Sequence, residues 1–362
     1  MLTSCLLLWL AASQASTKEP GRPALPSRPM LGVKIYETKR PAKELFQEWR
    51  ELGINTVFAS VALNRDPSFR EEASRAGIAR FVILPTFFDP DALKADPGLY
   101  AITASGDRAV DEWVEFVCPS RDAFRRRKIE FIKEVLRDAD PDGLSLDFIR
   151  HFVFWEKVYP DRDPASLPRA CFDRNCLEAF QKAKGVALPP GLETPRQAAA
   201  YLATQHRDAW LSWRCELITS MIQQIAQEAR AIKPAVQINV HLVPWRRDDF
   251  DGALRGVAGQ DLAGISAHTD YVSPMTYAHM LKRPPAWVHS VVADVAAQTD
   301  RPVVPSIQVG KAYLETPLSV DEFAEALRQA LAPPSAGVVF WSWQALEDEP
   351  DKKAVLRRLL KR

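Results

Sequence analysis

The chain has 362 residues, 47% of them hydrophobic, so it can form a sizeable core in one large domain or two ordinary ones. Lys and Arg number 47 and Asp and Glu 46. This near balance excludes the strongly basic surface that nucleic acids or anionic membranes attract, so neither is an expected partner.

The first fifteen residues have the pattern of a signal peptide. An apolar stretch, residues 6–12, precedes the small-x-small sequence Ser13-Gln14-Ala15, and residues 16–29 have the composition of a linker. The basic residues that usually open a signal peptide are absent, so a wrongly assigned start or a short anchor stays an alternative. The stretch is too short for a membrane span. We expect a secreted or periplasmic protein whose main domain covers residues 30–362. It would be a lipoprotein if the natural N-terminus is longer, because residues 2–5 have the form of a lipobox.

Four cysteines follow this region: Cys118, Cys171, Cys176 and Cys215. No pair has Cys-x-x-Cys spacing, so the sequence argues against a structural zinc site. In an exported protein, Cys171 and Cys176 can form a local disulfide. The alternative is that the thiols are free and buried.

Eight short apolar runs are predicted strands. They are Leu31–Tyr36, Asn55–Ser60, Ala79–Phe87, Gly143–Ile149, Val236–Leu242, Tyr271–Tyr277, Val303–Val309 and Val338–Trp343. Most are continuous rather than alternating, which is typical of parallel strands covered on both faces. Helical patterns lie between them, such as Ala42–Leu52, Arg121–Ala139, Asp321–Leu331 and Asp351–Leu360. Eight strand–helix units predict an α/β fold, the (β/α)8 TIM barrel. The alternative is an open doubly wound sheet, but no Gly-rich phosphate loop follows the first strand.

Two connections, after the third and fourth strands, are long. Residues 88–120 form the first, and residues 150–195 form the second, which includes a short helix at Leu177–Lys184. Long loops in a domain are usually functional or disordered, and we interpret both as walls of a substrate cleft. A long helical segment, Gln197–Ile232, then leads to the fifth strand.

Polar and aromatic residues gather at the C-terminal ends of the predicted strands, the face on which TIM barrels place their active sites. They are Glu37, Asp89, Asp147, Arg150, His241, Tyr277, His279, Gln308, Trp343 and Gln344. Asp147 is the first candidate for catalysis, because an acid that ends an apolar strand is desolvated at a cost. For each of these residues the alternative is a structural role.

The segment Asp142-Gly143-x-x-x-Asp147-x-x-Arg150 resembles the fourth-strand signature of bacterial glycoside-hydrolase-like TIM barrels. Residues 171–189 resemble the segment that follows that strand, and Gly259–Leu262 with Asp270–Tyr277 resembles the sixth strand. The likeness runs over most of Leu31–Leu346. It implies a glycoside hydrolase that acts on a poly- or oligosaccharide without a cofactor.

Two more distant families share part of this strand. Family 18 barrels read DGxDxDxE, and here Ser145 and Ile149 replace the middle Asp and the catalytic Glu. Barrels of the α-amylase type read DGxRxD, whose last Asp matches Asp147, while Ser145 replaces the Arg. That group keeps its acid at the end of the fifth strand, where this chain has His241.

Glycosidases generally use two carboxyl groups, and their separation sets the stereochemical outcome. Asp147 is predicted to act as nucleophile or base, with Arg150 keeping it ionised through a charge-assisted hydrogen bond. Glu156 is the predicted general acid, because its apolar neighbours Phe154 and Trp155 should raise its pKa. The alternatives for this acid are Glu37, Asp89, Glu315 and Glu347.

Further residues are predicted to bind the substrate. His241 and Tyr277 would orient sugar hydroxyls or the nucleophile, and Trp155, Trp245, Trp341 and Trp343 are candidate stacking surfaces. Trp341 and Trp343 are two residues apart, so on one strand both would line the barrel if either does. The predicted substrate-binding set is Glu37, Asp89, Arg150, Trp155, His241, Tyr277, His279, Gln308, Trp341 and Trp343.

The six His residues form neither HxH nor HExxH, so no catalytic metal is predicted. Two alternatives to a glycosidase stay open. One is a sugar-binding barrel that has lost its acid, as the missing fifth-strand Glu suggests. The other is a metal-dependent hydrolase of another bond class.

Overall fold

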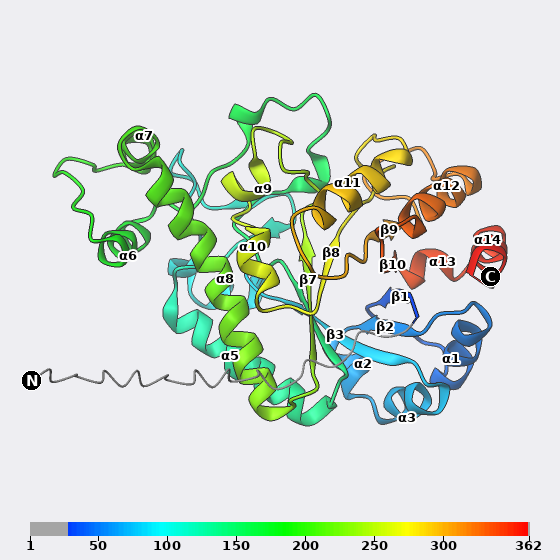
Figure 1. Cartoon of the computed structure of the whole chain (residues 1–362). Coiled ribbons are helices and arrows are strands. Elements are labelled where there is room, and N and C mark those ends of the chain that lie inside the picture. Colours follow the sequence, from blue (N-terminus) through cyan, green and yellow to red (C-terminus); the bar gives the residue numbers. More distant parts are fainter. Residues whose placement is uncertain (1–27, 361–362) are drawn as a thin grey trace, which may run out of the picture.

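A computed structural model describes residues 28–360 of the chain. Eight parallel strands surround its centre, and their order in space follows their order in the chain (Figure 1). They are β1 (Met30–Ile35), β2 (Thr56–Ala59), β3 (Ala79–Pro85), β6 (Gly143–Asp147), β7 (Gln237–Leu242), β8 (Tyr271–Pro274), β9 (Ser306–Gln308) and β10 (Gly337–Trp341). Parallel bridges from Val272 to Val303 and from Met275 to Ser306 join the two edge strands, β8 and β9, and so close the barrel. The predicted TIM barrel is confirmed; the signal peptide and most of the linker lie outside the described residues.

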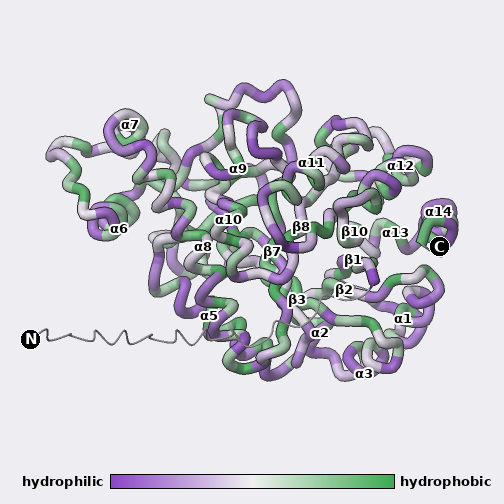
Figure 2. Tube along the Cα trace, viewed as in Figure 1, coloured by the Kyte–Doolittle hydropathy of each residue, from purple (hydrophilic) through white to green (hydrophobic). Residues whose placement is uncertain are grey.

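Helices cover the outside of the barrel. The longer ones are α1 (Ala42–Glu51), α3 (Pro67–Ala76), α5 (Asp122–Ala139), α6 (Arg174–Lys184), α7 (Pro195–Gln205), α8 (Arg207–Ile232), α11 (Ala286–Ala296), α12 (Val320–Leu331) and α14 (Pro350–Leu360). The short ones are α2 (Val61–Arg65), α4 (Pro90–Ala95), α9 (Ala253–Gly256), α10 (Leu262–Ser266) and α13 (Trp343–Leu346). Figure 2 shows that the outer helices carry both hydrophobic and hydrophilic positions, as helices packed on a barrel do. In residues 28–360 no helix is both long enough and apolar enough to cross a membrane.

The interior of the barrel has an apolar layer and a polar layer. Residues that alternate along the strands form the apolar one: Met30, Phe58, Phe81, Ile83, Tyr271, Val304 and Val339. Gly143 faces this layer, and a Cβ atom there would lie 2.2 Å from the Phe81 ring. Further along the strands come buried polar side chains, among them Lys34, Ser145, His241 and Ser306. Gly143, the second position of the sequence motif, therefore serves packing, and Asp147 lies at the end of the same strand.

The two long connections pair with each other at the C-terminal end of the barrel. The first contains α4, a 3-10 turn at Pro97–Leu99 and a hairpin of β4 (Val110–Asp111) and β5 (Val114–Glu115). The second contains 3-10 turns at Trp155–Lys157 and Pro164–Ser166 before α6. The Phe172 N–H donates to the Ile102 carbonyl at 2.9 Å, and the Ala104 N–H donates to the Arg169 carbonyl at 2.9 Å. Each loop thus supports the other.

Two expectations about these elements were wrong in detail, and one of the two alternatives for the cysteines is excluded. The helical segment Gln197–Ile232 is two helices, α7 and α8, separated at His206, whose backbone leaves the helical region at φ −140°. The last strand ends at Trp341, and Trp343 begins α13. The strand period therefore does not extend to Trp343, and the two Trp residues do not share a face. Cys118, Cys171, Cys176 and Cys215 are free and buried, so the disulfide alternative is not formed.

Candidate active site

Asp147 ends β6 at the C-terminal face of the barrel. Its Oδ1 accepts a hydrogen bond of 2.8 Å from the Phe148 N–H. Burial alone would raise the pKa of Asp147, but the neighbouring bases His241 and Lys34, with the Phe148 N–H and Arg150, outweigh it and lower the pKa below its ordinary value. The carboxyl group is therefore ionised at neutral pH.

Lys34 is a member of this site that the sequence analysis missed. It lies on β1 with only 1% of its surface exposed, and its Nζ donates to the Tyr277 Oη at 3.3 Å. Burial lowers its pKa to about 8, although the charge of Asp147 acts in the opposite direction. A signal was present, because a lysine inside the buried run Gly32–Ile35 is costly unless it has a charged neighbour.

Glu156 lies in the 3-10 turn that follows β6, and it is only 8% exposed. Burial raises its pKa to about 7, the charge of Asp147 adds to this, and Arg150 opposes it. In the described part of the chain its Oε2 has no hydrogen-bond partner. An apolar setting thus keeps this carboxyl group protonated far above the usual range, as the sequence predicted.

The positive charge of Arg150 lowers the pKa values of both Asp147 and Glu156, but its guanidinium group donates a hydrogen bond to neither carboxyl group. Its Nη1 donates to the Val153 carbonyl at 2.7 Å, and its guanidinium lies over the Phe116 and Phe148 rings at 4.8 and 5.2 Å. The predicted hydrogen bond from Arg150 to Asp147 is therefore wrong. Its charge acts through space, because the aromatic rings and the backbone fix the guanidinium.

His241 is at the end of β7 and belongs to a polar network across the barrel floor. Its Nε2 lies 2.9 Å from the Ser145 Oγ, and the Asn239 Nδ2 donates to the same oxygen at 3.1 Å. Burial, with the charge of Lys34, lowers the pKa of His241 to about 3 against the effect of Asp147. The ring is therefore neutral at physiological pH, so the positive charges that act on Asp147 at that pH are those of Lys34 and Arg150.

Aromatic side chains form one side of the site. Tyr277 stacks on Trp341 with ring centres 4.5 Å apart and an angle of 15°, and Trp155 lies 5.7 Å from Tyr277 on another side. The Tyr277 Oη is also 3.3 Å from the Ser306 Oγ. These contacts bring the predicted residues Trp155, Tyr277 and Trp341 together, and Lys34 joins the group through the Tyr277 hydroxyl.

A second aromatic pair, not predicted, lies nearer the surface. The Trp113 Nε1 donates to the Tyr313 Oη at 2.7 Å, and these side chains are 47% and 38% exposed. Trp113 meets Phe148 and Phe154 edge-on, with ring centres 6.1 and 6.2 Å apart. Phe148 directly follows Asp147 in the chain, and Phe154 lies two residues before Glu156. No local signal marks this pair, because its members come from loops 200 residues apart.

Other predicted residues are tied to structural partners. Asp89 caps α4 and pairs with the Lys128 Nζ at 2.7 Å. Gln308 accepts from the Met280 N–H at 2.9 Å and donates to the Gly310 carbonyl at 2.6 Å. The His279 ring contacts the Thr316 carbonyl and Glu322. These contacts position loops and leave these three residues out of the group around Asp147.

The remaining predicted residues also point elsewhere. Glu37 is exposed, and its carbonyl accepts from the Gln344 Nε2 at 2.8 Å. Trp343 is buried edge-on against Trp49 at 5.6 Å, and Trp245 is buried against Phe250 at 5.5 Å. The two Trp side chains serve core packing, so neither offers a stacking surface for a sugar.

A separate cavity lies between α7, α8 and the chain around α9, and Arg169, Arg207 and Arg247 are among its lining residues. It contains none of the residues grouped around Asp147. In residues 28–360, neither Asp147 nor Glu156 belongs to a cluster of three or more potential metal ligands. The arrangement at Asp147 can therefore supply one ionised carboxylate, one protonated carboxyl group and aromatic surfaces.

Comparisons with known proteins place the fold among glycoside hydrolase barrels. The glycoside hydrolase domain of PgaB (BpsB) from Bordetella bronchiseptica superposes with a TM-score of 0.68 at 15% identity, over 90% of this chain and 98% of that domain. A β-galactosidase from the haloarchaeon Halorubrum lacusprofundi gives a TM-score of 0.64 at 14% identity, over 92% of this chain and 57% of the other. Gan42B, a GH42 β-galactosidase from G. stearothermophilus, gives a TM-score of 0.61 at 12% identity, over 92% of this chain and 56% of the other.

The sequence matches no family model and no curated protein. At 12–15% identity the structural likeness shows the fold alone, and the chain spans little more than half of the two β-galactosidases. The likeness to bacterial glycoside-hydrolase-like barrels is thus confirmed at the level of the fold. The more distant likeness to family 18 and α-amylase-type barrels stays a prediction.

Proposed function

We propose that the protein is an exported glycoside hydrolase that cleaves a poly- or oligosaccharide, with Asp147 as nucleophile or base and Glu156 as general acid. The observation that carries this proposal is the opposite displacement of two neighbouring pKa values. Asp147 is held ionised, and Glu156 is held protonated up to a pH of about 7. This division of roles is what cleavage of a glycosidic bond requires.

Each acid would act at a defined point of the reaction. Glu156 would donate its proton to the leaving glycosidic oxygen as the bond to the anomeric carbon breaks. Asp147 would either attack that carbon directly or take a proton from the attacking water. Lys34 would hold Asp147 ionised, and the Tyr277–Trp341 stack would offer an apolar face to a sugar ring.

Hydrolysis of glycosides with different leaving groups tests the assignment of Glu156. We expect Glu156→Gln to reduce kcat about 10²- to 10⁴-fold on natural glycans, because these need protonation of the leaving oxygen. An aryl glycoside with an acidic phenol as leaving group needs little protonation, so the variant should keep most of its activity on that substrate. Equal losses on both substrates would remove Glu156 from the acid role.

Glu37→Gln and Asp89→Asn are the comparison variants, since those carboxyl groups were alternatives for the same role. Glu37 is exposed, and Asp89 is engaged by Lys128 and the α4 cap. We expect neither variant to separate natural glycans from activated aryl glycosides. If either did so and Glu156→Gln did not, the acid would have to be reassigned.

A sugar-binding barrel without catalysis is the second candidate function. Near its C-terminal end the fifth strand carries His241 rather than a carboxylate, and Glu156 is supplied by a loop instead of a strand. Binding of glycans by the wild-type protein, with no hydrolysis of any of them, would favour this alternative.

A further inference from the structure

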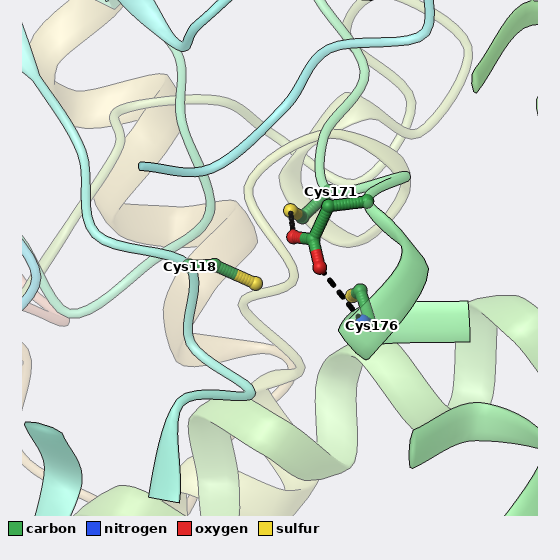
Figure 3. A group of neighbouring side chains, drawn as sticks. Cys118, Cys171 and Cys176 are labelled. Carbon is green, nitrogen blue, oxygen red and sulfur yellow. Dashed lines mark hydrogen bonds between the residues drawn. The ribbon is translucent and has the colours of Figure 1, made fainter. Parts of the chain in front are cut away.

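Three cysteines and one aspartate meet at a point where the two long loops cross. The Sγ atoms of Cys118, Cys171 and Cys176 and a carboxylate oxygen of Asp173 all lie within 4.8 Å of one another. Cys118 comes from the end of the loop after β3, just before α5, and the others come from the loop after β6 and the first turn of α6. Figure 3 shows the three thiols turned toward one common space.

The spacing suits one tetrahedral ion. Zinc binds thiolates at about 2.3 Å, so the ligand atoms of a tetrahedral site are about 3.8 Å apart. Four ligand atoms within 4.8 Å can reach that spacing with small side-chain rotations. The three cysteine side chains are at most 1% exposed, so the position is shielded from water, as structural zinc sites are.

The hydrogen bonds of the cluster leave one oxygen and three sulfurs facing inward. Asp173 Oδ1 caps α6 by accepting from the Cys176 N–H at 2.9 Å, while Oδ2 accepts from the Cys171 thiol at 2.6 Å. The Ile102 N–H donates to the Cys171 Sγ at 3.1 Å, the kind of outer bond that orients a metal thiolate. The Cys118 Sγ lies 3.1 Å from the Ser120 hydroxyl. The three sulfurs and a carboxylate oxygen of Asp173 nevertheless surround a shared centre (Figure 3).

Two arginine side chains, Arg121 and Arg214, lie next to the cysteine cluster. Arg121 lies 3.3 Å from Asp173 Oδ1, and the buried Arg214 donates to the Ala170 carbonyl at 3.1 Å, directly before Cys171. Three thiolates and a carboxylate carry four negative charges against two on a zinc ion. The two guanidinium groups offset the difference, which a cluster of neutral thiols would not need.

We propose that Cys118, Cys171, Cys176 and Asp173 bind one zinc ion that fastens the two long loops to each other. Binding releases the thiol protons, including the one now donated to Asp173 Oδ2. The site has four protein ligands and no open position, so its role is structural. It would hold the strand pairing between residues 102–104 and 169–172, next to the segment that supplies Phe116 beneath Arg150.

Metal analysis of the full chain, purified under reducing conditions without chelator, tests this proposal. We expect about one zinc per chain and loss of that zinc in Cys118→Ser and Cys176→Ser. Cys215→Ser is the matched control, because Cys215 is also a buried free thiol but lies in α8 outside the cluster. That variant should keep its zinc.

Cobalt replacement keeps the test valid if a cysteine variant does not fold. Wild-type protein stripped of metal and reloaded with Co²⁺ should show intense thiolate-to-cobalt absorption and tetrahedral d–d bands. Its melting temperature should rise on addition of Zn²⁺. Reduced wild-type protein that contains no zinc and takes up neither Zn²⁺ nor Co²⁺ would overturn the proposal, and so would iron in place of zinc or a disulfide among the three cysteines.

Discussion

At the scale of single residues, the site depends on two carboxyl groups in unlike surroundings. Asp147 has the basic side chains of Lys34 and Arg150 and a backbone donor beside it, whereas Glu156 is buried with one carboxyl oxygen that has no hydrogen-bond partner among the described residues. Their environments push the two pKa values apart, so one group can accept while the other donates at the same pH.

The pH dependence of hydrolysis should follow Glu156 on its basic side. The general acid must be protonated, so kcat/KM should fall as pH rises through about 7. In Glu156→Gln the amide cannot titrate, and the remaining activity on an activated aryl glycoside should lose this basic limb. A limb that persists unchanged in the variant would belong to another group.

Lys34 should control the acidic side of the same profile. Its charge lowers the pKa of Asp147, so Lys34→Met should raise that pKa and move the acidic limb to higher pH. Lys34→Arg keeps a positive charge and should move the limb less. Measurement of kcat/KM between pH 3 and 7 checks this, and an acidic limb at the same pH in all three proteins would exclude the coupling.

At the scale of elements, small residues in the barrel strands decide how the inner layers pack. A Cβ atom on Gly143 would lie 2.2 Å from the ring of Phe81, which is fully buried. Gly143→Ala should therefore lower the free energy of unfolding by about 1–3 kcal/mol, measured by denaturant titration. Gly256→Ala is the control, since a Cβ atom there meets nothing within 4 Å. Equal stability of the two variants would contradict this packing.

The hairpin of β4 and β5 should contribute to substrate binding through Trp113. If Trp113 and Tyr313 stack on a sugar ring, Trp113→Ala should raise KM about 2- to 10-fold with a smaller change in kcat, the equivalent of one aromatic contact. Phe131→Ala is the matched control, because Phe131 is an exposed aromatic residue on the outer helix α5. Equal KM values for the two variants would exclude Trp113 from the binding surface.

The sequence predicted where the strands lie better than it predicted where each strand ends. All eight strands were located because a continuous apolar run reports burial on both faces, which is a local property. Strand ends were less accurate: in the predicted strand Val338–Trp343 the apolar residues continue to Trp343, interrupted by Ser342 alone, although the strand ends at Trp341 and α13 begins at Trp343. Hydrophobicity alone cannot mark that change.

Residues brought together by long-range packing were the hardest to predict. Asp147, His241 and Tyr277 could be named because the fold fixes where strand ends meet, whereas Glu156 was named from its apolar neighbours Phe154 and Trp155. Whether Asp89 or Gln308 faces the site depended on Lys128 and on the loop that carries Met280, which no spacing in the sequence reveals. The cysteine cluster could not be predicted from the sequence for the same reason, because its members come from two loops and share no Cys-x-x-Cys motif.

At the scale of the whole molecule, buried histidines should govern stability in mild acid. Burial lowers the pKa of both His151 and His241 to about 3, so unfolding lets each take up a proton below its ordinary pKa of 6.5. The stabilisation that comes from keeping both histidines neutral is complete above pH 6.5 and is lost as the pH falls from 6.5 toward 3. Glu156 acts in the opposite sense, because its raised pKa costs stability as pH rises from 4.5 to about 7.

The two histidines together change the stability more than the one glutamate does. The free energy of unfolding should therefore decrease as the pH is lowered from 6.5 to 4.5. Denaturant titrations across this range check the sign, and Glu156→Gln should steepen the decrease because the opposing group is removed. Stability that increases on acidification over this range would show that the histidines are not held neutral.

The most direct test of the central claim is the release of reducing sugar from a broad panel of polysaccharides by wild-type protein and by Asp147→Asn. We predict that the wild type hydrolyses at least one glycan, and that Asp147→Asn loses on the order of 10³-fold or more in kcat while it unfolds at a similar denaturant concentration and still binds the glycan. Undiminished hydrolysis by a folded Asp147→Asn protein would contradict the account.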